Sequence, residues 1–260
     1  MTLKDIIERE KNCTKEITKD MSKKQKLAYF WDYYKWHFLI TVAVIIFVIY
    51  LIVHYVNAKE EALFAAMVNF SATETEEAEF KNAFIQYINL DTDKYSVDIN
   101  DTVTIGLGAS LGTPYTGHDL LAAYIGGDQL DVMCTGENVF FDYAYEDTFL
   151  PLSRYMSEEE IEKLDGRLYY VDASVVEGYT EAIRNMDYDY SADAAEPDKP
   201  GEMERPVAVG VFVDDSYWID KCFKCDDEEV GRFVAGVVAN SHRTENAAKF
   251  IFFLTDKTKE

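Results

Sequence analysis

The sequence predicts an α/β domain joined to a single membrane-spanning helix near its amino terminus. Residues 38–56 contain no charged side chain. Farther along the chain, short apolar segments typical of strands alternate with segments whose apolar residues recur at helical spacing. The chain therefore divides into a tail at residues 1–37, a transmembrane helix at 38–56 and an α/β domain at 57–260.

The uncharged segment has the length of a helix that crosses a bilayer. At roughly 1.5 Å per residue, its 19 residues extend about 28 Å, close to the hydrocarbon thickness of a membrane. The residues just before it are mainly basic, with Lys23, Lys24, Lys26 and Lys35 against Asp32. Because the more basic flank stays in the cytoplasm, we expect a single-pass protein of the cell membrane with a cytoplasmic amino terminus and an extracytoplasmic carboxy-terminal domain.

The segment has two other interpretations. A buried core helix would normally carry a polar face, which this segment lacks. A cleaved signal peptide usually has a shorter apolar run of about 7–15 residues, although the small residues around Val56-Asn57-Ala58 would suit a signal peptidase. A retained anchor fits the length best.

The charge of the domain limits its partners. Residues 59–260 hold 16 basic and 42 acidic residues, a net charge of −26. Such a domain repels phosphate backbones, which excludes nucleic acid as a partner. The charge keeps the domain soluble, and it also favours cationic ligands. With 48% hydrophobic and 14% aromatic residues, the chain has enough apolar surface for a packed core.

The pattern of elements predicts a parallel sheet covered by helices on both faces. Capping boxes at Thr73-x-x-Glu76 and Ser157-x-x-Glu160 each predict the start of a helix. The polar, proline-containing stretch 191–206 predicts a loop or linker. Strands are expected at 63–68, 95–99, 102–105, 130–134, 168–171, 207–213 and 233–239, and helices at 116–125, at 137–145 and from Thr244 onward.

The cysteines leave several interpretations open. Cys222 and Cys225 have the spacing of a redox pair, but the preceding residues 214–218 read as a loop rather than as part of a thioredoxin-like frame. A disulfide, local or with Cys134, free thiols, and a redox or metal role all remain. A zinc site would need more ligands than the domain supplies, so no metal and no cofactor is expected.

A serine motif raises the question of hydrolysis. Residues 108–112 read Gly-x-Ser-x-Gly, and Asp214 or Asp215 and then His242 follow in the order of a hydrolase triad. A nucleophile elbow needs a helix directly after its serine, whereas Thr113-Pro114 indicates a loop. We therefore expect no enzymatic activity, and a hydrolase that uses Ser110 is the weakest of the hypotheses.

Three segments resemble the extracellular solute-binding proteins of bacterial ABC importers, which have the type 2 periplasmic binding fold. The first, 121–132, reads as a helix, Gly126-Gly127 and a strand with Asp131-Val132. The second is Phe149-Leu150-Pro151-Leu152-Ser153. The third, 237–251, reads as a strand, Asn240-Ser241, a polar turn and an alanine-containing helix that reaches Phe250-Ile251. The resemblance covers about residues 60–255.

The resemblance implies a non-enzymatic binding domain. Members of that family have a second lobe, for which this chain has only residues 169–206, so the likeness is to one lobe. One lobe favours a membrane or envelope protein as the partner. The alternative is an accessory solute-binding component of an ABC-type importer, in which Tyr217 and Trp218 would line a pocket for a small-molecule solute. The implied binding edge lies at the carboxyl ends of the strands, at Asn69, Ser71, Thr135, Glu137, Asp214 and Asp215.

Overall fold

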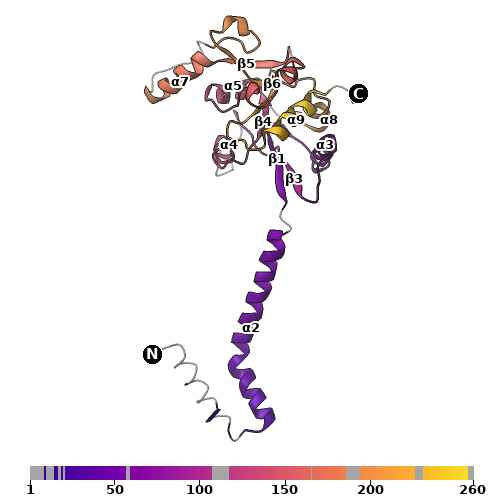
Figure 1. Ribbon diagram of the computed structural model, residues 1–260, viewed down its shortest axis with the longest axis vertical. Coiled ribbons are helices and arrows are strands. Elements are labelled where there is room, and N and C mark those ends of the chain that lie inside the picture. Colours follow the sequence, from indigo (N-terminus) through magenta and orange to yellow (C-terminus); the bar gives the residue numbers. More distant parts are fainter. Residues whose placement is uncertain are drawn as a thin grey trace. The chain divides into compact units, whose positions relative to one another are not determined.

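The computed structural model describes residues 21–56, 59–106, 117–164, 166–185, 194–225 and 231–256, together with positions 9, 15, 16 and 19. The chain forms two compact units, Met1–Ala58 and Lys59–Glu260 (Figure 1). Helix α2, Lys23–Val56, dominates the first unit. Its window Lys35–Val53 has a mean hydropathy of 2.7 and is long and apolar enough to cross a membrane. None of this window is buried in the structure, whereas a core helix would be buried.

The second unit is built on a six-stranded sheet with the order β3-β1-β4-β8-β6-β5. Strand β1 pairs in parallel with β3 and β4, whereas β4–β8, β8–β6 and β6–β5 are antiparallel pairs. The predicted α/β domain is confirmed, but the prediction of a wholly parallel sheet is wrong. The strands are β1 (Glu60–Met67), β3 (Tyr95–Asn100), β4 (Val132–Gly136), β5 (Leu168–Asp172), β6 (Pro206–Phe212) and β8 (Phe233–Val237).

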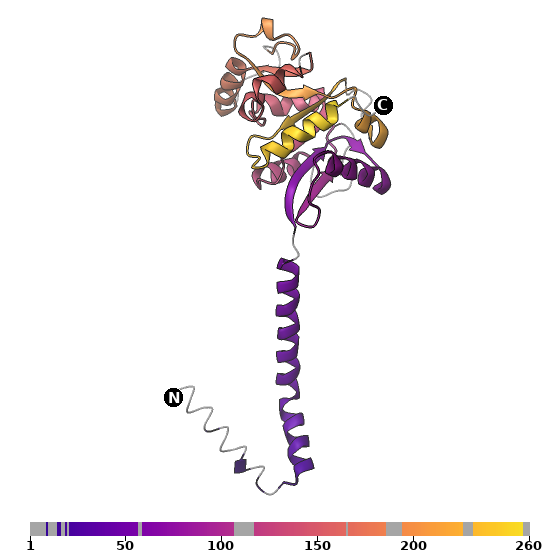
Figure 2. The same cartoon turned by 45° about the vertical axis from the view of Figure 1, so that its right-hand side comes forward.

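Helices cover both faces of this sheet, as the sequence predicts. Because side chains alternate along a strand, Leu63, Ala65 and Met67 of β1 enter one hydrophobic cluster, and Phe64 and Ala66 enter the other. The first cluster includes α3 (Glu74–Tyr87), α8 (Tyr217–Cys222) and α9 (Thr244–Thr255), and the second includes α4 (Gly117–Gly126), α5 (Glu137–Tyr145) and α7 (Ala173–Asn185). Figure 2 shows α9 lying against the sheet.

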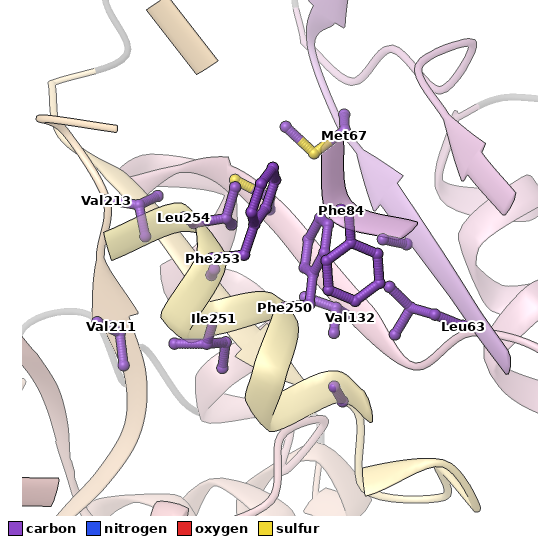
Figure 3. Packing of buried hydrophobic residues seen from close by; sticks show 14 of the residues in the cluster. Leu63, Met67, Phe84, Val132, Val211, Val213, Phe250, Ile251, Phe253 and Leu254 are labelled. Atoms are coloured by element: carbon purple, nitrogen blue, oxygen red, sulfur yellow. The ribbon is translucent and has the colours of Figure 1, made fainter. Parts of the chain in front are cut away.

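Aromatic packing dominates the first cluster (Figure 3). The rings of Phe84 and Phe250 meet edge to face with centroids 5.0 Å apart, and Phe80 and Phe253 do so at 5.5 Å. Such pairs contribute about 0.5–1.5 kcal/mol each beyond the burial of their area. Both clusters consist of residues from the second unit alone, so residues 59–260 contain their own core.

Helix starts follow the sequence closely. Both capping boxes are present, at Thr73 before α3 and at Ser157 before α6 (Glu158–Glu162), and α9 begins at Thr244 as predicted. Residues 214–218 are not all loop, since the hydroxyl of Ser216 caps α8 by accepting a hydrogen bond from the Ile219 N–H. Helix α7 was also not predicted. The short elements are β2 (Phe70–Ser71), β7 (Lys224–Cys225), η1 (Leu152–Arg154) and η3 (Pro200–Glu202).

The polar stretch predicted as a linker is tied to the edge strand β5. Within its described residues 194–205, the carbonyl of Pro197 accepts a hydrogen bond from the N–H of Tyr170 at 2.9 Å. The carboxylate of Asp172 accepts from the N–H groups of Glu204 at 2.6 Å and Arg205 at 3.2 Å. The stretch therefore covers part of the sheet edge.

Candidate functional site

All six residues nominated from the sequence lie at one edge of the sheet. Strands β1, β4 and β6 run in the same direction, because β8 is antiparallel to both β4 and β6 and β1 is parallel to β4. We call the edge where these three strands end the carboxyl edge, and the opposite one the amino edge. Strand topology thus brings together residues more than a hundred positions apart. Whether they bind a ligand stays a prediction.

Asn69 fastens the chain beside β1. Its side-chain amide donates to the carbonyl of Ile105 at 2.7 Å, and its carbonyl oxygen accepts from the Ile105 N–H at 2.6 Å. Its backbone N–H bonds the carbonyl of Val103 at 3.0 Å. The side chain is 2% exposed, and its φ of 64° lies in the left-handed region that asparagine tolerates. These bonds hold 102–105 in place without a strand, which corrects the expectation of one there.

Ser71 and Thr135 differ in their surroundings. Ser71 is half-buried in β2, where it pairs with Lys224 of β7. Thr135 belongs to β4 and is fully buried, and its hydroxyl has no hydrogen-bond partner among the described residues. A buried, unsatisfied hydroxyl is uncommon in folded proteins.

Glu137 begins α5, where the partial positive charge of the helix end favours a carboxylate. Arg232 forms a bidentate ion pair with the Glu137 carboxylate, with Nε 3.1 Å from Oε2 and Nη2 3.0 Å from Oε1. The same guanidinium donates through Nη1 to Asp198 at 3.1 Å and lies 3.8 Å from the centre of the Phe212 ring. Sequence reasoning missed Arg232, whose only signal is its place directly before a strand.

Asp214 and Asp215 follow β6 and are also engaged. Asp214 accepts a hydrogen bond from the N–H of Phe233 at 2.5 Å, and burial raises its pKa despite that bond. Asp215 receives a bidentate contact from Arg167, at 2.5 and 2.7 Å. Arg167, too, was not among the nominated residues. The ionic groups of this edge that the structure describes are thus bound largely to one another.

The structure contradicts the pairing of Asp214 with His242 that a hydrolase triad would need. Asp214 is hydrogen-bonded to Phe233, the first residue of β8. His242 is exposed and follows the far end of the same strand, at the amino edge. A strand of five residues separates the two by roughly 16 Å, far beyond hydrogen-bond reach. Ser110 and the rest of its motif lie outside the described residues.

Two of the segments that carry the family resemblance meet at the amino edge. Asp131 is 1% exposed and accepts hydrogen bonds from the Phe64 N–H at 2.8 Å, the Ser241 hydroxyl at 2.6 Å and the Arg243 Nε at 2.7 Å. Asn240 donates to Asp128 at 2.7 Å. The Asp-Val and Asn-Ser motifs are therefore joined to each other, away from the nominated site.

The structure contains no disulfide among Cys134, Cys222 and Cys225. Cys134 and Cys222 are buried, and burial raises the pKa of both thiols, which disfavours the reactive thiolate. Within the described part of the chain, no group of histidine, cysteine and acidic side chains is arranged to hold a metal ion.

A groove lies beside the carboxyl edge, along the outer side of α3. Its volume is about 740 Å³, and Trp218 of α8 forms one wall. The indole is stacked on Phe253 with centroids 5.6 Å apart, which fixes its orientation. The other lining residues, all from α3, are Glu74, Thr75, Ala78, Glu79, Asn82, Ala83 and Gln86. The groove mixes carboxylate, amide and aromatic groups, a combination suited to a polar ligand.

Comparison with known proteins finds similar solved structures of low sequence identity. No known family profile and no curated protein sequence matches the chain. The chain is similar to the substrate-binding domain of a provisionally named molybdenum ABC transporter from Clostridium difficile, with 13% identity over 76% of this chain and 93% of that one and a TM-score of 0.32. It is also similar to an ABC substrate-binding protein from Listeria monocytogenes in complex with cycloalternan, with 12% identity over 77% of this chain and 76% of that one and a TM-score of 0.35. At these values the likeness concerns the path of the chain alone.

Proposed function

We propose that this chain is a membrane-anchored, extracytoplasmic binding protein without enzymatic activity, and that it engages a membrane or envelope protein through the carboxyl edge. The observation that carries the proposal is the pairing of ionic groups there. Arg232 binds Glu137 and Asp198, and Arg167 binds Asp215. Charges fixed in this way form a preorganised surface pattern, which in protein interfaces sets specificity and orientation.

The charge of the domain and the helix before it support the same function. A net charge of −26 over residues 59–260 favours a partner with a basic surface. The apolar window of α2, Lys35–Val53, follows a lysine-rich stretch, which supports a retained anchor with the domain outside. Strand β1 begins at Glu60, so the chain enters the domain at the amino edge.

Site-specific crosslinking in the native membrane tests this function. A photoreactive amino acid is placed in the full-length chain at Lys224, exposed at the carboxyl edge, or at His242, exposed at the amino edge. We expect one discrete protein adduct from position 224 and none from position 242. Adducts of equal yield from both positions, or from neither, would contradict the proposal.

A second candidate function is an accessory solute-binding component of an ABC-type importer. The observation in its favour is the groove that Trp218 lines, as the solute hypothesis requires, although Tyr217 is not among the lining residues. A thermal-shift screen of residues 59–260 against sugars, amino acids and small amines tests it. A saturable rise in the unfolding temperature with one chemical class supports solute capture, and a flat response across all classes contradicts it.

A further inference from the structure

We propose that Tyr217, Trp218 and Glu79 form a binding site for the ammonium group of a ligand, and that the side chain of Lys221 holds this site until the ligand displaces it. The inference rests on the proposed binding function and adds the chemistry of what is bound. The site lies where α8 meets the middle of α3, at the groove described above.

The positions of the side chains show that an ammonium group fits. Lys221 Nζ lies 5.0 Å from the centre of the Trp218 ring and 5.7 Å from that of Tyr217, and it forms an ion pair with Glu79. The two rings meet edge to face, with centroids 5.2 Å apart and planes at 77°, so they make a corner. Two aromatic rings and a carboxylate are the groups that recognise alkylammonium ions.

The Lys221 side chain is replaceable at this site. It is 37% exposed and its partner Glu79 is 48% exposed, so solvent weakens their attraction. An incoming ammonium group would meet the same rings and the same carboxylate, while Lys221 would turn into water. A quaternary ammonium group has the further advantage that it is only weakly hydrated and loses little on leaving water.

The groove supplies room and polar partners for the rest of the ligand. Asn82 and Gln86 follow Glu79 along one side of α3, at spacings that place them on the same face of the helix. Ala78 and Ala83 are small and leave the volume of about 740 Å³ open. A ligand with its ammonium group at Trp218 can therefore extend along α3 and hydrogen-bond to the two amides.

The ammonium group has two sources that the test must separate, a small quaternary amine and a lysine side chain of a protein partner. Trp218 is the single tryptophan in residues 59–260, so its fluorescence reports directly on the site. These residues contain both core clusters and are tested as a separate domain. The probes are choline, its neutral carbon analogue 3,3-dimethylbutanol, and a short oligolysine peptide.

Four versions of the domain are compared. In addition to the unchanged domain, K221Q removes the resident ammonium group, E79Q removes the carboxylate, and K249Q is the matched control. Lys249 forms an exposed ion pair with Glu245 at 2.6 Å, so K249Q makes the same change of charge at a site outside the groove. Circular dichroism and thermal unfolding check that each variant is folded.

The expected result is saturable quenching or a spectral shift with choline or with oligolysine. Affinity should rise about tenfold in K221Q, stay unchanged in K249Q and fall about tenfold in E79Q. Response to choline assigns a small amine, and response to the peptide alone assigns a protein lysine. Three results would each overturn the inference. Choline and its neutral analogue could bind with equal affinity, or K221Q and K249Q could gain affinity equally. The third is that folded K221Q responds to neither choline nor oligolysine. Crosslinking from position 224 is independent of all these outcomes.

Discussion

Replacing Asp131 with alanine is expected to destabilise the domain by about 3–5 kcal/mol, the usual cost of removing one partner of a buried ion pair. Three hydrogen bonds to this carboxylate would be lost, from Phe64, Ser241 and Arg243. At about 1.5–3 kcal/mol for each bond to a charged group, their sum would be larger. The lower range applies because Arg243 also binds Glu61 at 3.0 Å, so its charge stays partly compensated.

Urea unfolding of residues 59–260, followed by circular dichroism, measures this loss. In thermal unfolding of the same residues, a loss of about 3–5 kcal/mol should lower the melting temperature by about 6–20 °C, at about 2–4 °C per kcal/mol for a domain of this size. Asp128 serves as the control in the same motif. It is exposed, receives a hydrogen bond from Asn240 and has a left-handed φ of 54°, so it is replaced by asparagine, which tolerates that conformation; D128N should cost under about 1 kcal/mol.

The Asp131 variant also tests the structural role assigned to the family-like motifs. A loss no larger than that of the Asp128 variant would refute the reasoning, since the buried ion pair would then contribute nothing measurable. A double-mutant cycle with Arg243→Gln should give a coupling energy of about 0.5–3 kcal/mol. A coupling near zero would lead to the same conclusion.

Three further predictions concern packing, pH and topology. A methyl group at Gly236 would come within 2.8 Å of the Phe140 ring, so G236A should cost about 1–3 kcal/mol. Gly178 of α7 is exposed and a methyl group there meets no atom within 4 Å, so G178A should gain about 0.5–1 kcal/mol. Thermal unfolding that ranks the two variants the other way contradicts this. Burial alone would raise the pKa of Asp172, but hydrogen bonds from a serine hydroxyl and three backbone N–H groups outweigh it and lower the pKa. The stability that ionised Asp172 contributes is therefore complete above its ordinary pKa and is lost as the pH falls through its lower pKa in the folded state. D172N should make the free energy of unfolding depend less steeply on pH in the acid range. An unchanged slope argues against this. In intact cells, a cysteine at exposed Asp93 should react with an impermeant thiol reagent, and labelling only of residues before α2 would reverse the proposed orientation.

The site could be predicted in part. Each nominated residue follows or ends a strand, so its place at the carboxyl edge follows once the strand directions are known. The arginines could not be found in this way. Arg167 reaches Asp215 across 48 positions and Arg232 reaches Glu137 across 95. No local pattern marks such a pair, because its members are brought together only by the pairing of distant strands.

The sequence by itself determined the local features of this protein. The uncharged segment 38–56 of α2, the starts of helices at Thr73 and Ser157, and the alternation of β1 between two cores all depend on side chains within a few residues of one another. Tertiary structure alone decided that β8 lies antiparallel between β4 and β6, and that the carboxylates of the candidate site are paired with arginines. The reason is physical. Propensities and caps act over about one helical turn, whereas strand order and ion pairing depend on which distant surfaces bury the most apolar area together.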